Sequence, residues 1–463
     1  MPIKNNNQVG RLNTHSLAAV VVAGLLSGLP QAYAQTTPAS PDTPAPAAQP
    51  APVPMVTPLA GFLGPLLQTD RRLAAAAEDL EAGNQRTKAA AGDWYPSLKV
   101  TTWAGKERID NPATADTALH AKQADLTLTQ LITDFGKTDA KVMKAKIAAQ
   151  QSEVSYQLTK QTLIHDASTA YVNLYRAGIQ LKYAMESEAN LTKQYQLEAA
   201  RLQAGGGVAT DLLQVQAQLA GAQARRYRAQ VQVQNANSRF FNLFGVAVAN
   251  TQTLVAPAFP DGLPASMDDA FKQAQESNLG IMNALLSSES ARQSIRADRA
   301  EGFFPKFEII YDYKDKYDVA GTAGLKNEQL LKGQLSWSLN LGGAGFNTVK
   351  AGEHSLAAAE YRRTDAEKNA REQVSIAWET LASSRQTAAV FANQVTALSR
   401  FLELARKERA LGSRSLLDIL NGETSLLTAQ SDAISAEVDV LLSGYAVLLS
   451  VGQLSEVAVS RLK

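Results

Sequence analysis

Two stretches of this 463-residue chain combine great length with an almost complete lack of helix-breaking residues. The first runs from about residue 137 to 204 and contains no proline and one glycine, Gly178. At 1.5 Å per residue, a helix of this length would extend for about 100 Å. A second stretch of the same kind runs from about residue 347 to 411. The chain must therefore accommodate two helices far longer than those of ordinary globular domains.

Small and apolar side chains recur along both stretches at alternating steps of three and four residues. This is the period of coiled coils, and the small side chains let partner helices approach closely. Both stretches end at a glycine-containing turn, after which return helices are expected over 209–244 and 413–452. The turn residues are Gly205, Gly206 and Gly207 in the first half, and Gly412 and Ser413 in the second.

The two long helices belong to an internal duplication. The aromatic-proline step beginning at Trp94 recurs 209 residues later at Phe303. Ala170 is matched 207 residues later by Ala377. Several matches at a nearly constant offset indicate two copies of one large unit. We divide the chain into repeat 1 over 65–247, an equatorial linker over 248–265, repeat 2 over 266–455 and a C-terminal tail over 456–463.

Each repeat shows the same order of elements before its long helix. A helix is expected first, over 66–92 and 266–301, and a β-hairpin follows, over 97–132 and 306–340. Apolar and polar residues alternate in these hairpins, which is typical of strands with one apolar face. Four aromatic residues on the strands predict a girdle at a membrane interface. They are Trp103, Tyr311, Tyr313 and Trp337.

The N-terminus has the features of an export signal. Lys4 and Arg11 precede a 13-residue apolar run, and Ala32-Tyr33-Ala34 fits the small-residue cleavage rule. We therefore expect residues 1–34 to be a signal peptide. Residues 35–64, which contain eight prolines, are expected to form a disordered tether.

Composition excludes several function classes. Lys and Arg total 45 against 44 Asp and Glu, so the balance gives no reason to expect a nucleic-acid partner. The chain has no cysteine, and its four histidines lie far apart in sequence. No nucleophile–base pair or metal-ligand cluster is found, so neither an enzyme nor a cofactor is predicted.

The strand count predicts an oligomer. Four strands cannot close a barrel, and a bilayer does not tolerate open sheet edges. Three chains would supply 12 strands, which is within the range of outer-membrane barrels. We therefore expect an α+β membrane protein: a homotrimer with a 12-stranded barrel in outer-membrane lipid, continued by an α-helical coiled-coil barrel.

These features, together with the turns G-x-x-x-x-T-D and G-S-R-S-L-L-D, resemble the TolC family of outer-membrane export channels. The resemblance covers about residues 65–455. It implies a passive channel that docks a periplasmic adaptor and an inner-membrane transporter. The Gly-Ser-Arg turn and the lack of a lipidated cysteine favour type I protein secretion with an ABC transporter. Multidrug efflux with an RND transporter is the alternative.

The resemblance also implies a gate at the periplasmic helix tips. Its lock would join Arg414 to Thr210 and Asp211, and the position of an assisting aromatic residue is Arg409 here. Its constriction would be a ring of carboxylates at Asp418, with Asn421 at the second ring position. A different reading is an exported coiled-coil scaffold without a membrane part, which explains the heptads but not the two apolar-faced hairpins.

Overall fold

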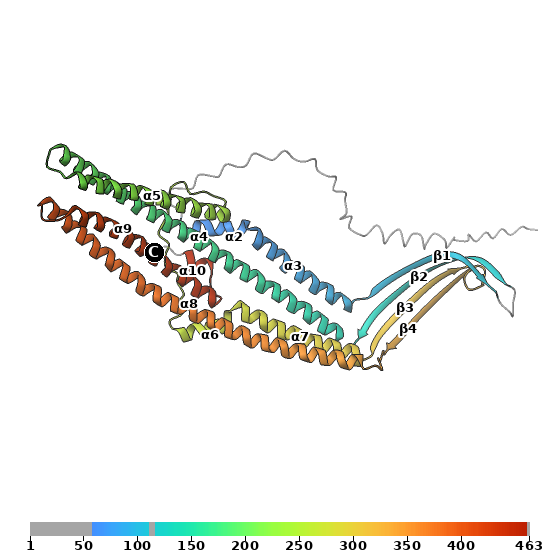
Figure 1. The fold of residues 1–463 in the computed structure, drawn as a ribbon. Coiled ribbons are helices and arrows are strands. Elements are labelled where there is room, and N and C mark those ends of the chain that lie inside the picture. The colour runs from blue at the N-terminus through green and yellow to red at the C-terminus, as the bar shows by residue number, and fades with distance from the viewer. Residues whose placement is uncertain (1–57, 111–115, 461–463) are drawn as a thin grey trace, which may run out of the picture. The chain divides into compact units, whose positions relative to one another are not determined.

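A computed structural model of the protein describes residues 58–110 and 116–460. The predicted signal peptide, 1–34, and the tether up to residue 57 lie outside the described residues. All described residues belong to one compact unit, 51–463. Within this unit, a four-stranded sheet is joined to a layer of long helices (Figure 1).

The four strands form a single antiparallel sheet in the order β1-β2-β3-β4. Each repeat contributes one hairpin, and the two hairpins are joined by pairing of β2 with β3. Within the described residues, β1 and β4 are therefore open edges. The strands are β1 (Ser97–Ile109), β2 (Thr117–Thr133), β3 (Lys306–Tyr317) and β4 (Leu325–Ser336).

The register separates an apolar face of the sheet from a polar face. One row across the strands is Leu98, Leu128, Tyr311 and Leu331, and its side chains share a face because paired residues point the same way. The polar face carries the row Thr101, Asp125, Lys314 and Glu328. Charged side chains on this face pair across strands, as Lys316 does with Glu328 at 2.7 Å.

The four aromatic residues predicted to form a girdle do not share one face of the sheet. Tyr311 and Tyr313 share the apolar face, and Trp337 directly follows β4 in the alternation of Leu335. Trp103 instead lies in a row with Gln123 and Lys316 on the polar face. The reason is the alternation of side chains along β1. Trp103 points to the same face as Lys99 and Thr101, whereas the apolar residues of this strand point to the other face.

Two helices of 67 residues run away from the sheet, and each returns through a shorter helix. Left-handed glycines precede both long helices, Gly136 with φ 98° and Gly343 with φ 76°. The buried Asp134 carboxylate accepts hydrogen bonds from the Thr138 backbone and hydroxyl and so caps the first long helix. The helices are α4 (Lys137–Gln203), α5 (Ala209–Phe244), α8 (Ala344–Ala410) and α9 (Leu416–Ser450).

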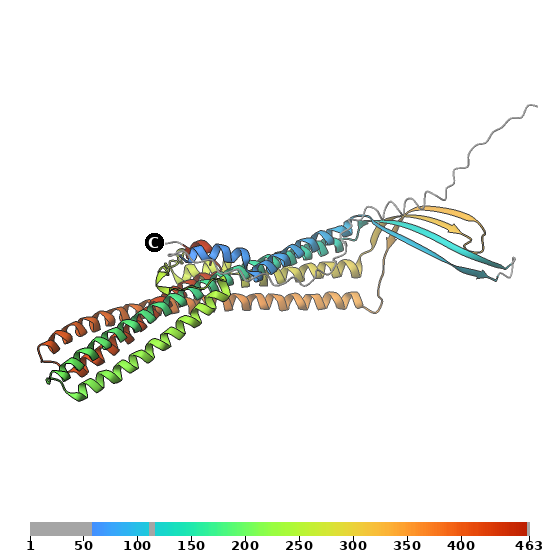
Figure 2. The ribbon, with the colours of Figure 1, turned by 90° about the horizontal axis from the view of Figure 1, so that it is seen from above.

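The helices form a layer with a different membership at its two ends (Figure 2). Near the strands the order is α3-α4-α7-α8, and towards the turns it is α5-α4-α9-α8. The layer has an open edge on each side. On one side it is formed by α3 and α5, and on the other by α8, and each of these helices has a face without a helix partner among the described residues. The additional helices are α2 (Leu59–Thr69), α3 (Arg71–Ala91), α6 (Met267–Ser277), α7 (Leu279–Phe303) and α10 (Glu456–Ser460).

The single helix expected at the start of each repeat is two helices. Asp70 accepts hydrogen bonds from the backbone N–H groups of Arg72 and Leu73, which ends α2 and caps α3. Asn278 caps α7 in the same way through the N–H groups of Gly280 and Ile281. Such Asx caps turn the chain in place of continuing the helix.

Two terminal segments contain helices that the sequence analysis did not predict. The tether was expected to reach residue 64, but α2 begins at Leu59, and Phe62 and Leu63 are buried in the main core. The expected tail contains α10, which packs against α2 and buries Val459. Apolar burial explains both corrections, since these residues complete a core that the long helices leave open.

That main core lies at the level of the equatorial linker. Tyr171, Phe240 and Tyr445 are fully buried there. The Tyr171 hydroxyl donates to the carbonyl of Val255 in the linker (2.9 Å), and burial raises the pKa of Tyr171 to about 12. The α9 helix is apolar enough over 18 residues to cross a bilayer, but half of that stretch is buried against other helices. We therefore treat α9 as a core helix.

Candidate functional site at the helix tips

The two turns that end the long helices have closely similar backbones. Gly205 and Gly412 adopt left-handed conformations, with φ of 78° and 80°. Gly206 N–H donates to the Arg201 carbonyl (3.1 Å), and Ser413 N–H donates to the Glu408 carbonyl (3.0 Å). Both helices thus end in the same hydrogen-bonded glycine motif, as expected for duplicated turns.

The second turn, between α8 and α9, is held by its own residues. The Ser415 hydroxyl accepts from the Asp418 N–H and caps α9. Arg414 donates from Nε to Asp418 Oδ2 and from Nη1 to Glu408 Oε2, both at 3.1 Å. Its guanidinium also lies over the Phe401 ring, 5.1 Å from the centroid. Arg414 is therefore bound within its own hairpin, and its hydrogen bonds in the chain do not reach Thr210 or Asp211.

The ion-pair contact between the two hairpins near their tips is made by Arg409, at the end of α8. Its Nη2 lies 3.2 Å from Asp211 Oδ2, on α5, and 3.5 Å from Glu198 Oε1, on α4. Its Nη1 donates to the Arg414 carbonyl at 3.3 Å. Within one chain, Arg409 therefore contacts Asp211, because its side chain points across the gap between the hairpins, while Arg414 folds back onto its own turn. The lock that joins Arg414 to Thr210 and Asp211 stays a prediction.

Glu198 is the buried anchor of this contact. It is 4% exposed, and its Oε1 also accepts from Arg201 Nη1 at 2.9 Å. A buried carboxylate is stable only when its charge is paired, so the two arginines are required partners. A second buried glutamate, Glu423 on α9, forms an ion pair with Arg406 of α8. Sequence reasoning missed both glutamates; the available signal was an acidic residue at an inward heptad position.

The remaining predicted gate residues lie close to this contact. Asp418 is half-exposed in the first turn of α9, and Asn421 is exposed one turn further along. Thr210 is exposed in the first turn of α5, next to Asp211. Among the residues that the structure describes, no group of three or more His, Cys, Asp or Glu side chains is placed to hold a metal ion.

Comparison with known proteins places the chain among channels. The sequence model of a family described as "Outer membrane efflux protein" matches residues 63–246 and 270–453, which coincide with the two repeats. The outer membrane protein TolC of Escherichia coli is 25% identical over 349 residues, covering 73% of this chain and 70% of TolC.

Two further similarities extend over more of the chain. The alkaline protease secretion protein AprF of Pseudomonas aeruginosa is 24% identical over 406 residues, covering 84% of this chain and 83% of AprF. The crystal structure of the CmeC outer membrane channel of Campylobacter jejuni shares the fold, with a TM-score of 0.73 at 15% identity and 85% coverage of both chains.

Together with the family match and the similarity to TolC, a duplicated α+β chain with an amphipathic sheet and 67-residue helices defines an outer-membrane channel with a periplasmic helical part. The chain belongs to the outer membrane efflux protein family. It is a transport channel of the outer membrane and not an enzyme.

Proposed function

We propose that three copies of this chain form one continuous channel across the outer membrane and the periplasm. The observation that carries the proposal is the open sheet, whose β1 and β4 edges lack strand partners among the described residues. Pairing β4 of one copy with β1 of the next satisfies these edges, and three copies give 12 strands in a closed barrel. The apolar face would then meet lipid and the polar face would line the channel.

The helical layer has open edges that fit the same assembly. On α5 every seventh residue from Leu213 to Phe241 is exposed. The large side chains of this stripe are those of Leu213, Tyr227 and Phe241. On α8 the exposed side chains of Ile376 and Leu404 belong to a second stripe with seven-residue spacing. Exposed heptad stripes require a helical partner. Packing α5 of one copy against α8 of the next would bury both stripes and close a helical barrel.

Within this assembly the helix tips would act as the gate. Arg409 ties the first hairpin to the second through Asp211 and Glu198, and this contact is our candidate for the lock. Three copies would bring three Asp418 carboxylates around one axis, where they would favour cations. Arg414 pairs with Asp418 in each chain, and Asn421 is neutral. The negative electrostatic potential at the constriction would therefore be weak.

We further propose that the channel serves type I protein secretion. The name of its relative AprF, an alkaline protease secretion protein, supports this branch. The transport energy would come from an ABC-type inner-membrane transporter, coupled through a periplasmic adaptor. The names of TolC and of the efflux protein BepC of Brucella suis are compatible with drug efflux through an RND-type transporter, which is the second candidate.

Deleting the gene separates the two branches. We expect the deletion strain to lose one or a few large secreted proteins from its culture medium while its sensitivity to dyes and antibiotics stays unchanged. Complementation with the intact gene should restore secretion. Increased drug sensitivity with an unchanged set of secreted proteins would contradict the secretion branch and support efflux.

A further inference from the structure

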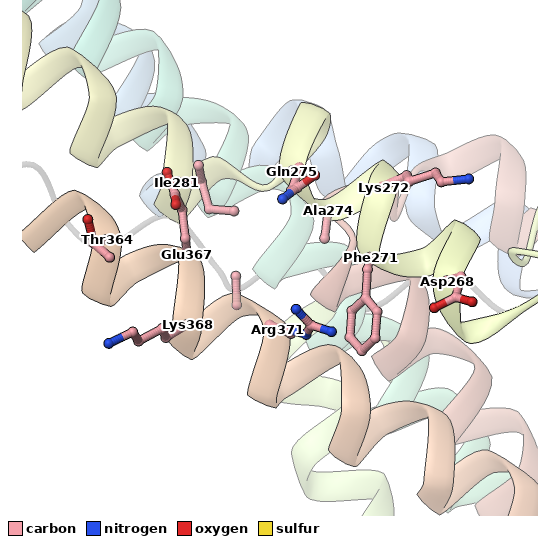
Figure 3. A pocket seen from close by; sticks show the side chains of 11 residues that line it. Asp268, Phe271, Lys272, Ala274, Gln275, Ile281, Thr364, Glu367, Lys368 and Arg371 are labelled. Carbon is pink, nitrogen blue, oxygen red and sulfur yellow. The ribbon is translucent and has the colours of Figure 1, made fainter.

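Two features of the molecule lie away from the helix tips. One is a groove of about 500 Å³ between α6 and α8 (Figure 3). Its lining includes the basic residues Lys272, Lys368 and Arg371 and the acidic residues Asp268 and Glu367. Because these charges nearly balance, the groove has no strong net charge that would select a ligand. The other feature is the loop that joins β3 to β4, and its contacts are specific.

This loop, residues 318–324, has a defined structure, and we call it the strap. The Asp318 N–H donates to the Gly324 carbonyl (3.1 Å), and the Gly324 N–H donates to the Asp318 carboxylate (2.8 Å). Asp318 and Ala320 adopt left-handed backbone conformations, with φ of 57° and 55°, which residues other than glycine rarely occupy. Such conformations persist only where the surrounding contacts hold them.

The strap reaches across the sheet to the first hairpin. The Gly321 N–H donates to Oε2 of Glu107, on β1, at 3.1 Å. A Cβ built at Gly321 lies 3.3 Å from the Thr117 hydroxyl oxygen and 3.5 Å from Cδ1 of Ile109. In the sheet, β2 lies between β3 and β1, and two strand spacings amount to about 10 Å. The strap must therefore cross β2 to make these contacts.

The strand register shows which face of the sheet the strap crosses. Glu107, Ile109 and Thr117 share the alternation of Asp125, so all of them lie on the polar face. Ala121 of β2 lies on the same face and is fully buried, whereas its neighbours in the chain, which point to the other face, are exposed. The strap therefore covers the polar face at the end of the sheet that is remote from the helices.

In the proposed trimer the polar face lines the barrel, and each strap lies inside the outer opening. Twelve strands spaced about 4.8 Å apart and tilted by about 40° give a barrel about 24 Å across between backbones. Three straps on the inner wall leave an exit that is narrower than the barrel below them. The straps would thus form a second narrow point, far from the helix tips.

We propose that the strap is the exit constriction of the channel and sets an upper limit on the width of what passes outward. This inference rests on the proposed trimer and on the polar face lining the channel. Glu107 holds the strap against the barrel wall, and the bonds between Asp318 and Gly324 keep the strap in shape. Releasing or shortening the strap should therefore widen the exit.

The first test measures access to the barrel from outside the cell. Gln123→Cys places a thiol on the polar face, about 13 Å further into the barrel than the residue opposite Glu107, in a chain that has no natural cysteine. In intact cells, a small charged maleimide should label this thiol. A maleimide carried on a long polyethylene glycol chain should label it several-fold more slowly.

Shortening the strap should remove this difference. Deleting residues 319–323 leaves Asp318 and Gly324 between the paired residues Tyr317 and Leu325, and Asp-Gly is a favoured two-residue hairpin turn. In the shortened protein the large maleimide should label Gln123→Cys several-fold faster than in the protein with the full strap. Equal labelling rates with and without the strap would overturn the constriction.

The adjacent residue supplies a control that tests the proposed function separately. Ala124→Cys points to the apolar face, so neither reagent should label it in either background. If Ala124→Cys is labelled and Gln123→Cys is not, the polar face does not line the channel, and the proposed function fails together with the constriction.

A substitution at Glu107 tests the bond that holds the strap. Glu107→Ala removes the acceptor of the Gly321 N–H and should raise labelling of Gln123→Cys by the large maleimide, although less than the deletion does. Glu107→Gln keeps an acceptor oxygen and should label as slowly as the natural strap. Equal rates for the alanine and glutamine variants would overturn the role of Glu107.

A disulfide gives a second readout of where the strap lies. Thr117→Cys with Gly321→Cys should form a disulfide within one chain on mild oxidation. Ala118→Cys with Gly321→Cys should not, because Ala118 points to the other face. Equal yields for the two pairs would overturn the placement of the strap. Native mass spectrometry separates the causes: failure in an oligomer of three copies overturns the strap alone, and a monomer overturns the proposed function as well.

Discussion

The two helix tips share a backbone motif but are held by different means. The α8–α9 turn is fixed internally by the Ser415 cap and by the bonds of Arg414 to Glu408 and Asp418. The α4–α5 turn has three glycines, and its N-cap residue Val208 offers no side-chain hydrogen bond. Its ion pair with the second hairpin comes from Arg409, and Val215 of α5 packs in an apolar cluster with Leu416 and Leu420 of α9. Duplication has thus produced one turn that is held by its own side chains and one whose side-chain ion pair comes from the neighbouring hairpin.

This difference suggests that the two turns have different roles when the channel opens. A turn that is held by its own side chains can stay in place, and a turn with fewer internal bonds can move at its tip when the Arg409 ion pair is released. Within the first hairpin, the segment that we expect to move is 203–215, which contains the turn and the start of α5.

The largest effect is expected from removing the Arg409 ion pair. Arg409→Ala leaves Asp211 without its partner and takes one of two arginines from the buried Glu198, at a cost of about 2 kcal/mol at the tips. We expect a several-fold higher single-channel conductance in planar bilayers and faster amide exchange over 203–215.

Arg414→Ala is the matched control for Arg409→Ala. It should loosen the second turn but leave conductance nearly unchanged, because the Arg409 bridge remains. A large increase for Arg414→Ala with no change for Arg409→Ala would show that the lock lies at the originally predicted position.

The second prediction concerns the glycines of the first turn. A Cβ built at Gly207 lies 2.6 Å from the backbone nitrogen of Leu202, so Gly207→Ala must displace the backbone. We expect a local loss of about 2 kcal/mol, measured by amide exchange over the turn. At Gly206 a Cβ meets nothing within 4 Å, and Gly206→Ala should be almost neutral. Similar losses for both variants would contradict the geometry of this turn.

A smaller effect tests the capping difference directly. Ser415→Ala removes the cap of α9 and should cost about 1 kcal/mol, seen as faster exchange of the Asp418 amide. Val208→Ser adds a capping side chain to α5, where the backbone is already extended, and should slow exchange in its first turn. If Val208→Ser has no effect, the missing cap does not explain the looseness of the first hairpin.

The smallest predicted effect is a pH dependence away from the tips. Burial lowers the pKa of His165 below its usual 6.5, although nearby Asp166 partly opposes this. The unfolded chain therefore binds the proton more readily, and this contribution to stability is present above about pH 6.5 and is lost as pH falls through the folded-state pKa. Melting temperatures at pH 5 and 7.5 should differ less in His165→Gln than in the natural protein. An unchanged difference would exclude His165 as its source.

Sequence reasoning was most informative where structure is local. The long helix expected over 137–204 and the observed α4 differ by one residue at the end, because heptads and a terminal glycine act within a few residues of the chain. The breaks at Asp70 and Asn278 were missed, although both are Asx residues able to cap a helix. The apolar pattern continues through them, so periodicity alone gave single helices.

The candidate site depended on contacts between distant parts of the chain. Asp211 and Arg409 are 198 residues apart, and their pairing follows from the relative rotation of two hairpins, which no local pattern encodes. The face of Trp103 is a different case, because its alternation with Leu98 on β1 is a local pattern. The charge types at the tips were predictable, whereas their partners required the packed structure.

The central claim of the proposed channel is that one chain supplies a third of the β-barrel wall and a third of the helical-barrel wall. Native mass spectrometry of the protein purified in detergent tests it most directly, since each chain contributes at most 49.5 kDa. We predict a single species with three copies of the mature chain. A stably folded monomer that retains its sheet and helices without detergent would contradict the closed barrel.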